Sequence, residues 1–183
     1  MRARTCTVGS AGKLFALTGW RVGWLCATNR ELAARAVQIH TDLTYAAPTP
    51  LQHGVAAALR ATSSSEETDD AAFADECALF GGNAALLTEA LTACGLEVCP
   101  AEGGYFLVAR TPNEGAVTDL DFVHRLADDT GVVCTPLSVF YGGSAFPRGY
   151  CDLVRFTLCK SRAHVEAACR ALHAHATKVA SYV

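Results

Sequence analysis

Ser10, Lys13 and Arg21 are the residues near the start of this chain whose types and spacing could do chemistry. The lysine follows the serine by three residues and precedes the arginine by eight, in a stretch rich in glycine and other small residues. The chain's two tryptophans flank the arginine. Glycine permits close backbone approach and unusual dihedral angles, which a chain needs where it folds against a ligand. The stretch therefore predicts a compact site that holds an amine, a guanidinium and a hydroxyl.

A nucleotide-binding P-loop is one alternative for residues 9–13, which read Gly-Ser-Ala-Gly-Lys. That motif needs a further glycine at position 7 and Ser or Thr at position 14, where this chain has Thr7 and Leu14. The P-loop is therefore excluded. A lysine that does not cradle phosphate can instead condense with a carbonyl group. Lys13 taken alone is better explained as a solvated surface charge. Only the residues around it can distinguish a surface lysine from one that condenses with a carbonyl group.

The elements that would position this site follow from periodicity and capping residues. Asn29 is a suitable N-cap for a helix with Leu32, Ala36 and Val37 on its inner face. Proline is favoured in the first turn of a helix, so a second helix is expected to open at Thr49-Pro50. The elements expected in this part are strands over 5–9 and 20–27, a helix over about 30–40, an irregular segment over 41–49 that contains Tyr45, and the helix that opens at Thr49-Pro50.

A polar, acidic run over residues 62–70 separates this part from the rest, and it predicts a linker. We expect two domains, over residues 1–65 and 66–183. Strands and helices alternate in the second, which indicates an α/β or α+β fold in two layers. Its expected elements are a helix from Phe73 to a stop at Gly95, strands over 96–99 and 105–109, a helix capped by Thr118 that ends at Gly131, strands over 132–134 and 152–159, and a helix capped by Ser161.

Composition narrows the function classes. The net charge of −3 argues against nucleic acid as a partner, because phosphate binding requires a basic surface. No apolar run approaches membrane-spanning length. The nine cysteines form no C-x-x-C pair and no zinc-ligand spacing, so no metal site is predicted. They are expected to be small buried hydrophobic residues in a reducing compartment, which indicates the cytosol; an organelle-targeting extension before Met1 remains open.

Five motifs occur in an order that resembles one enzyme family. They resemble the class I/II aminotransferases, which are fold-type I enzymes dependent on pyridoxal 5′-phosphate (PLP). Within that class they are most similar to the kynurenine aminotransferases, also known as glutamine transaminase K and cysteine-S-conjugate β-lyase. The resemblance runs from about residue 6 to about residue 172. The motifs are residues 10–24 (Ser-x-x-Lys, then Arg-x-Gly), 49–52 (Thr-Pro-Leu-Gln), 102–107 (Glu-Gly-Gly-Tyr-Phe-Leu), 136–141 (Pro-Leu-Ser-Val-Phe-Tyr) and 154–160 (Val-Arg-Phe-Thr-Leu-Cys-Lys).

The resemblance implies a fold and a role for each site residue. The fold would be α/β: a remnant of the PLP-binding large-domain sheet, then the small α+β C-terminal domain. Lys13 would bind PLP covalently and, once displaced by the substrate amine, move the proton from the substrate α-carbon. Ser10 and Arg21 would bind the cofactor phosphate. Arg155 would hold the substrate α-carboxylate and so orient the Cα–H bond; a plain surface-strand arginine is its alternative.

The resemblance also implies partners. Tyr45 matches the position from which this family offers an aromatic side chain across the dimer interface to the neighbour's substrate pocket, and an ordinary loop tyrosine is the alternative. Gly103, Gly104 and Phe140 are expected to shape the second domain rather than to touch the chemistry. The implied ligands are an amino acid and a 2-oxo acid, and the full-length family forms homodimers.

This chain departs from the family in length. Family members are more than twice as long, and the groups that pair with the pyridine nitrogen and stack on the ring come from before the lysine, where twelve residues stand here. A truncated gene product and a genuinely short protein both remain open. Two functions follow. The first is a kynurenine-type aminotransferase acting on an aromatic or sulfur-containing amino acid, with or without β-lyase activity. The second is a non-catalytic module that binds a partner through the surface that forms the dimer interface in the full-length family.

Overall fold

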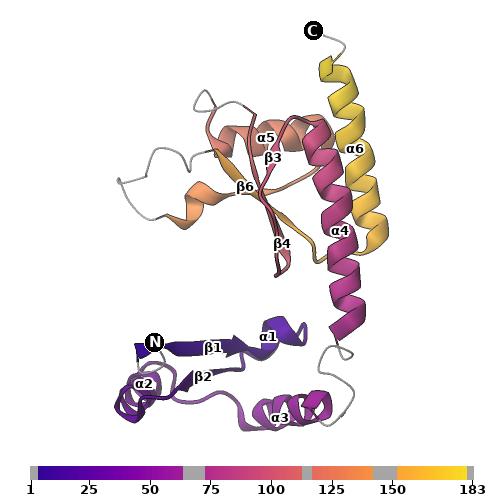
Figure 1. Ribbon diagram of the computed structural model, residues 1–183. Coiled ribbons are helices and arrows are strands. Elements are labelled where there is room, and N and C mark those ends of the chain that lie inside the picture. The colour runs from indigo at the N-terminus through magenta and orange to yellow at the C-terminus, as the bar shows by residue number, and fades with distance from the viewer. Residues whose placement is uncertain (1–3, 64–72, 113–116, 142–151, 181–183) are drawn as a thin grey trace. The chain divides into compact units, whose positions relative to one another are not determined.

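The computed structural model describes residues 4–63, 73–112, 117–141 and 152–180. The chain divides into two compact units, Met1–Ala72 and Phe73–Val183, each described here by itself (Figure 1). Most of the predicted linker, residues 64–70, lies outside the described residues. The mixed α/β fold expected from the sequence is confirmed by the alternation of strands and helices along the chain.

The first unit is built on a two-stranded antiparallel ribbon. Its strands pair from Cys6 opposite Ala27 to Ser10 opposite Gly23, so the ribbon closes next to the lysine turn. A small core of Ala11, Val22 and Val55 anchors that end. The elements are β1 (Cys6–Ser10), α1 (Ala11–Leu14), η2 (Thr18–Trp20), β2 (Gly23–Ala27), α2 (Arg30–Thr44) and α3 (Thr49–Ser63).

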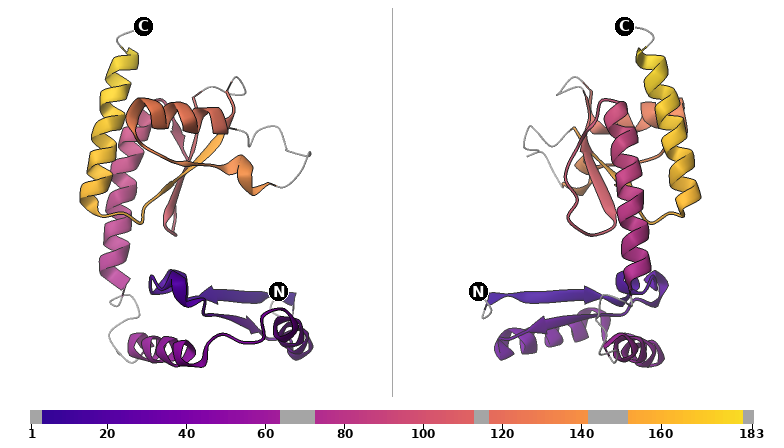
Figure 2. Two further views of the ribbon diagram at one scale, coloured as in Figure 1. Left: turned by 180° about the vertical axis from the view of Figure 1, so that it is seen from behind. Right: turned by 45° about the vertical axis from the view of Figure 1, so that its right-hand side comes forward.

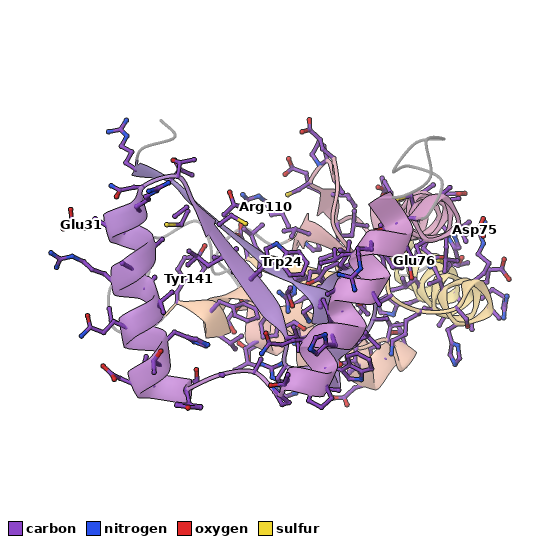
Figure 3. All side chains as sticks on the ribbon, turned by 90° about the horizontal axis from the view of Figure 1, so that it is seen from below. Trp24, Glu31, Asp75, Glu76, Arg110 and Tyr141 are labelled. Atoms are coloured by element: carbon purple, nitrogen blue, oxygen red, sulfur yellow. The ribbon has the colours of Figure 1, made fainter. Side chains whose placement is uncertain are left out.

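Helix α2 differs from the sequence expectation in its length and its burial. The cap is confirmed, since the Asn29 side chain accepts hydrogen bonds from the backbone N–H groups of Glu31 and Leu32 at 3.0 and 3.2 Å. The predicted irregular start at residue 41 is wrong, because the helix continues to Thr44. The predicted inner face is also wrong, since α2 has no buried residue and Val37 is 66% exposed. Glu31 points away from the ribbon (Figure 3).

The second unit packs three helices against an antiparallel sheet with the strand order β3-β4-β6-β5. Helices α4 and α6 run side by side in both views (Figure 2). The main core joins these helices to the sheet through residues such as Leu91, Leu107 and Leu172. The elements are α4 (Ala74–Ala93), β3 (Glu97–Val98), β4 (Phe106–Arg110), α5 (Asp119–Thr130), β5 (Thr135–Pro136), η4 (Leu137–Phe140), β6 (Leu153–Thr157) and α6 (Arg162–Ala180).

The central strands of this sheet alternate between two faces, as strand geometry requires. Leu107 and Ala109 of β4, with Val154 and Phe156 of β6, are buried in the core. The residues between them are half-buried on the opposite face, and Arg155 is one of these. The strand order therefore places Arg155 in the middle of the sheet, away from the helices.

Two further expectations are corrected in this unit. The strand predicted over residues 132–134 is not formed; the ladder with β6 starts at Thr135, where the chain first comes alongside that strand. The cysteines are not uniformly buried: Cys6, Cys26, Cys77 and Cys159 are exposed, although Cys134 and Cys169 are buried. Among the helices that the structure describes, none combines the length and apolar character needed to cross a membrane.

Candidate functional site

The turn that joins β1 to β2 carries three of the predicted site residues. Ser10 ends β1 and stands at the N-cap position of α1, and Lys13 lies in that single helical turn. Arg21 comes two residues before the start of β2. The backbone N–H of Ala11 donates to the carbonyl of Val22 at 3.1 Å, which closes the turn. Ser10, Lys13 and Arg21 are therefore held on one closed loop, and all three are exposed.

Glycine makes this closure possible. A Cβ atom on Gly23 would lie 2.6 Å from the carbonyl oxygen of Gly9, so the two strands approach more closely than a side chain allows. A Cβ on Gly9 would overlap the ring of Trp24, which is labelled on the ribbon in Figure 3. At Gly12 a Cβ would lie 3.1 Å from the Cα of Thr18. Gly9, Gly12 and Gly23 thus allow close packing around the lysine, whereas a Cβ on Gly19 would meet no atom within 4 Å.

The same loop holds strained backbone. Ala16 and Arg21 both have positive φ values, of 54° and 56°, which non-glycine residues adopt at a cost of about 1–3 kcal/mol. The Nη1 group of Arg21 donates to the carbonyl of Thr18 at 3.3 Å, which turns this side chain back along the loop. Such strain persists where surrounding structure enforces it, and it gathers at functional sites.

Tyr45 shows a third strained backbone, in the same unit. It follows the last turn of α2 with φ 65° and ψ −83°, close to the rare classic γ-turn. Its N–H donates to the carbonyl of Thr41 at 3.0 Å, and its side chain is 79% exposed. The aromatic ring is therefore presented to solvent from a strained turn at the end of α2.

Arg155 lies in the second unit, so the first unit contains four of the five predicted site residues and the second contains one. Its guanidinium carbon stands 3.9 Å from the ring centre of Phe106 and 4.6 Å from that of Phe140. Its Nε atom is buried and has no hydrogen-bond partner among the described residues. A buried N–H without an acceptor costs free energy. A ligand oxygen that accepted a hydrogen bond from this N–H would remove that cost.

The contact with Phe140 was missed by sequence reasoning. Phe140 was expected only to shape the domain, yet its ring stacks on the predicted substrate-binding arginine. Alternation along β4 could have indicated Phe106, since it lies two residues from Val108, which pairs with Arg155. Strand alternation does not indicate Phe140, because it belongs to η4 and not to a strand.

The donor set on the loop fits a phosphorylated aldehyde such as PLP. A hydroxyl and a guanidinium suit a phosphate group, and a primary amine suits an aldehyde. Gly12 is needed for the backbone of the loop itself, since a Cβ there would lie 3.1 Å from the Cα of Thr18 and 3.3 Å from the carbonyl oxygen of Leu17. No comparable case exists for a metal: within the described ranges, no three His, Cys, Asp or Glu side chains are grouped to hold one.

Comparisons with known proteins agree with this donor set. The profile of the family described as "Aminotransferase class I and II" matches residues 1–172. The probable kynurenine–oxoglutarate transaminase of Saccharomyces cerevisiae is 32% identical over 177 residues, covering 88% of this chain and 38% of that protein. The methionine aminotransferase of Escherichia coli is 32% identical over 172 residues, covering 94% and 42%.

A solved structure extends the likeness to the fold. The N-succinyldiaminopimelate aminotransferase of Mycobacterium tuberculosis is 33% identical, with a TM-score of 0.78 over 95% of this chain and 42% of that chain. This chain thus spans less than half the length of the relatives that it matches.

Proposed function

Because this chain belongs to the class I and II aminotransferases, we propose that it carries the lysine and substrate-carboxylate groups of a PLP-dependent transamination. The reaction moves an amino group from an amino acid to a 2-oxo acid. The observation that supports this most is the closed loop on which Ser10, Lys13 and Arg21 are exposed together. A surface lysine needs no such loop, with its three close glycine contacts and two strained residues.

Each residue would act through its own chemistry. The Ser10 hydroxyl and the Arg21 guanidinium would donate hydrogen bonds to the cofactor phosphate and hold it in position. The Lys13 amine would hold the cofactor aldehyde and would be the base that takes the proton from the substrate α-carbon. When bound, PLP supplies an electron sink for that carbon. Arg155 binds the α-carboxylate and so orients the Cα–H bond for proton removal.

Covalent capture tests the assignment of Lys13. The full chain is incubated with PLP, reduced with borohydride, digested and analysed by mass spectrometry. We expect the added pyridoxyl mass on Lys13, and its loss in Lys13→Ala. The matched control is Lys160→Ala, which removes another exposed lysine and should leave the label on Lys13. Equal labelling of both lysines would show that Lys13 is an ordinary surface amine.

We propose an aromatic or sulfur-containing amino acid as the donor, in keeping with the kynurenine aminotransferase type. The names of the yeast and E. coli relatives, which cover a kynurenine and a methionine enzyme, support this class. Formation of pyridoxamine 5′-phosphate from PLP-loaded chain, measured with kynurenine, methionine and aspartate, tests it. Aspartate as the best donor would contradict it.

The exposed thiols of Cys6, Cys26, Cys77 and Cys159 support a reducing compartment such as the cytosol.

The second candidate function is a non-catalytic module that binds a partner. It is favoured by the exposed apolar side chains of the first unit, among them Val8, Ile39 and Leu43 at 74%, 60% and 77% exposure. Apolar groups gathered at a surface are typical of interfaces, and a second copy or a longer paralogue could cover them. Sedimentation analysis together with the capture experiment separates the two functions, since a module would associate without labelling Lys13.

A further inference from the structure

Two arginines on the same face of the second unit's sheet are held in opposite ways. Arg110, labelled in Figure 3, forms an ion pair with Asp152 and a longer one with Glu97 at 3.7 Å. Arg155 instead contacts two aromatic rings, with its guanidinium carbon 3.9 Å from the centre of Phe106 and 4.6 Å from that of Phe140, and its buried Nε has no acceptor among the described residues. The first arginine is neutralised by carboxylates of the protein. The second is stabilised by aromatic faces, which do not neutralise its charge.

The two rings reach Arg155 from opposite sides of its strand. Phe106 belongs to β4, where Val108 pairs with Arg155. Phe140 ends η4, which follows β5, and there Thr135 pairs with Arg155. The ring of Tyr105 lies 4.6 Å from that of Phe106 and supports it. One ring therefore comes from a neighbouring strand and the other from the short helix that follows the strand on the other side, and together they restrict the guanidinium.

We propose that Phe106 and Phe140 are positioning residues that hold the Arg155 guanidinium in place for the carboxylate of the amino acid or 2-oxo acid. This inference rests on the proposed role of Arg155 in substrate binding. An arginine side chain has much rotational freedom, and a ligand that must first order it binds more weakly. Aromatic faces attract the cation and fix its plane while they exclude water from its sides. The site would therefore select a carboxylate that approaches along the guanidinium plane.

The test uses the full chain labelled with ¹⁵N-arginine and follows the Nε–Hε resonance of Arg155 by NMR, with phenylpyruvate as the 2-oxo acid probe. We expect a resonance shifted upfield by the two rings, and a further change on titration. Phe140→Leu keeps an apolar side chain but removes the aromatic face, and should weaken phenylpyruvate binding about 3- to 10-fold. Phe140→Tyr keeps the ring, and should stay within about twofold of the parent. Phe140 is 56% exposed, so neither change threatens the core.

The outcomes separate this inference from the proposed function. Equal affinity in the parent and in Phe140→Leu would overturn the positioning role, although the carboxylate role of Arg155 would stand. An Arg155 resonance that phenylpyruvate leaves unchanged in the parent would overturn both of these roles, while covalent capture at Lys13 would still decide the cofactor assignment. The Arg110 resonance serves as the internal control, because its ion pairs should make it indifferent to the probe. A parallel Phe106→Leu variant should repeat the effect from the other side.

Discussion

Substitution of Gly23 by alanine should open the lysine loop without touching any group that would contact a ligand. Gly23 pairs with Ser10 at the closed end of the ribbon. A Cβ there would lie 2.6 Å from the carbonyl oxygen of Gly9 and 3.6 Å from the Cα of Ser10. The nearest atom is backbone in the paired strand, so it cannot rotate away as a side chain would. The strands must separate by roughly 0.8 Å to regain ordinary van der Waals contact.

That separation acts on the hydrogen bond that closes the loop. The N–H of Ala11 donates to the carbonyl of Val22 at 3.1 Å, next to Gly23. Overpacking of this kind costs about 1–3 kcal/mol. If the cost is expressed as local opening, amide exchange at Ala11 should accelerate about 5- to 150-fold. Since opening separates Ser10 from Arg21, the yield of the reduced PLP adduct on Lys13 should fall as well.

Gly19→Ala is the matched control for this prediction. Gly19 lies in the same loop, but a Cβ there would meet no atom within 4 Å. Its substitution should change stability by no more than about 0.5 kcal/mol. Hydrogen exchange of the Ala11 amide in the parent and both variants, followed by mass spectrometry or NMR, measures the difference. If the two variants exchange at the same rate, the close approach at Gly23 does not hold the loop closed and the reasoning fails.

Two further predictions concern the second unit. Burial raises the pKa of the Cys134 thiol from 9.0 to about 12. Above pH 9 the unfolded chain therefore releases a proton that the folded chain keeps. Because of this difference, the free energy of unfolding should fall as the pH rises. Urea unfolding at pH 8 to 10.5 should show a shallower decline in Cys134→Ala; equal slopes would contradict the burial argument. Asn83→Ala removes hydrogen bonds from Nδ2 to the carbonyls of Leu158 and Lys160 at 3.0 and 2.9 Å, inside a fully buried site. It should lower the free energy of unfolding by about 2–3 kcal/mol in the same urea assay, and a loss below about 0.5 kcal/mol would count against it.

Elements with local signals could be predicted from the sequence. Helix α5 is capped by Thr118, whose hydroxyl accepts from the N–H of Asp121 at 3.1 Å, and Gly131, with φ 73°, caps its other end. Gly95, with φ 81°, ends α4 as expected. Each of these signals acts between residues a few positions apart, and such chemistry is the same in any fold.

Errors arose where a distant partner decides the outcome. Residues 132–134 have apolar character but pair with no strand in the part of the chain that the structure describes, whereas Thr135 pairs with β6. The apolar face of α2 was expected to be buried, and among the described residues nothing buries it. Periodicity indicates that a face is apolar, but burial requires a second surface that the local sequence does not specify.

For the candidate site, residue types and spacing alone determined the lysine loop, because serine, lysine, arginine and their glycines lie within a few residues of one another. Only the tertiary structure decided the surroundings of Arg155. Phe106 and Phe140 stand 49 and 15 residues before it, and they meet it because strands β4 and β5 pair with opposite edges of β6. Strand register, and with it the face that each side chain joins, is set by long-range backbone pairing and core packing.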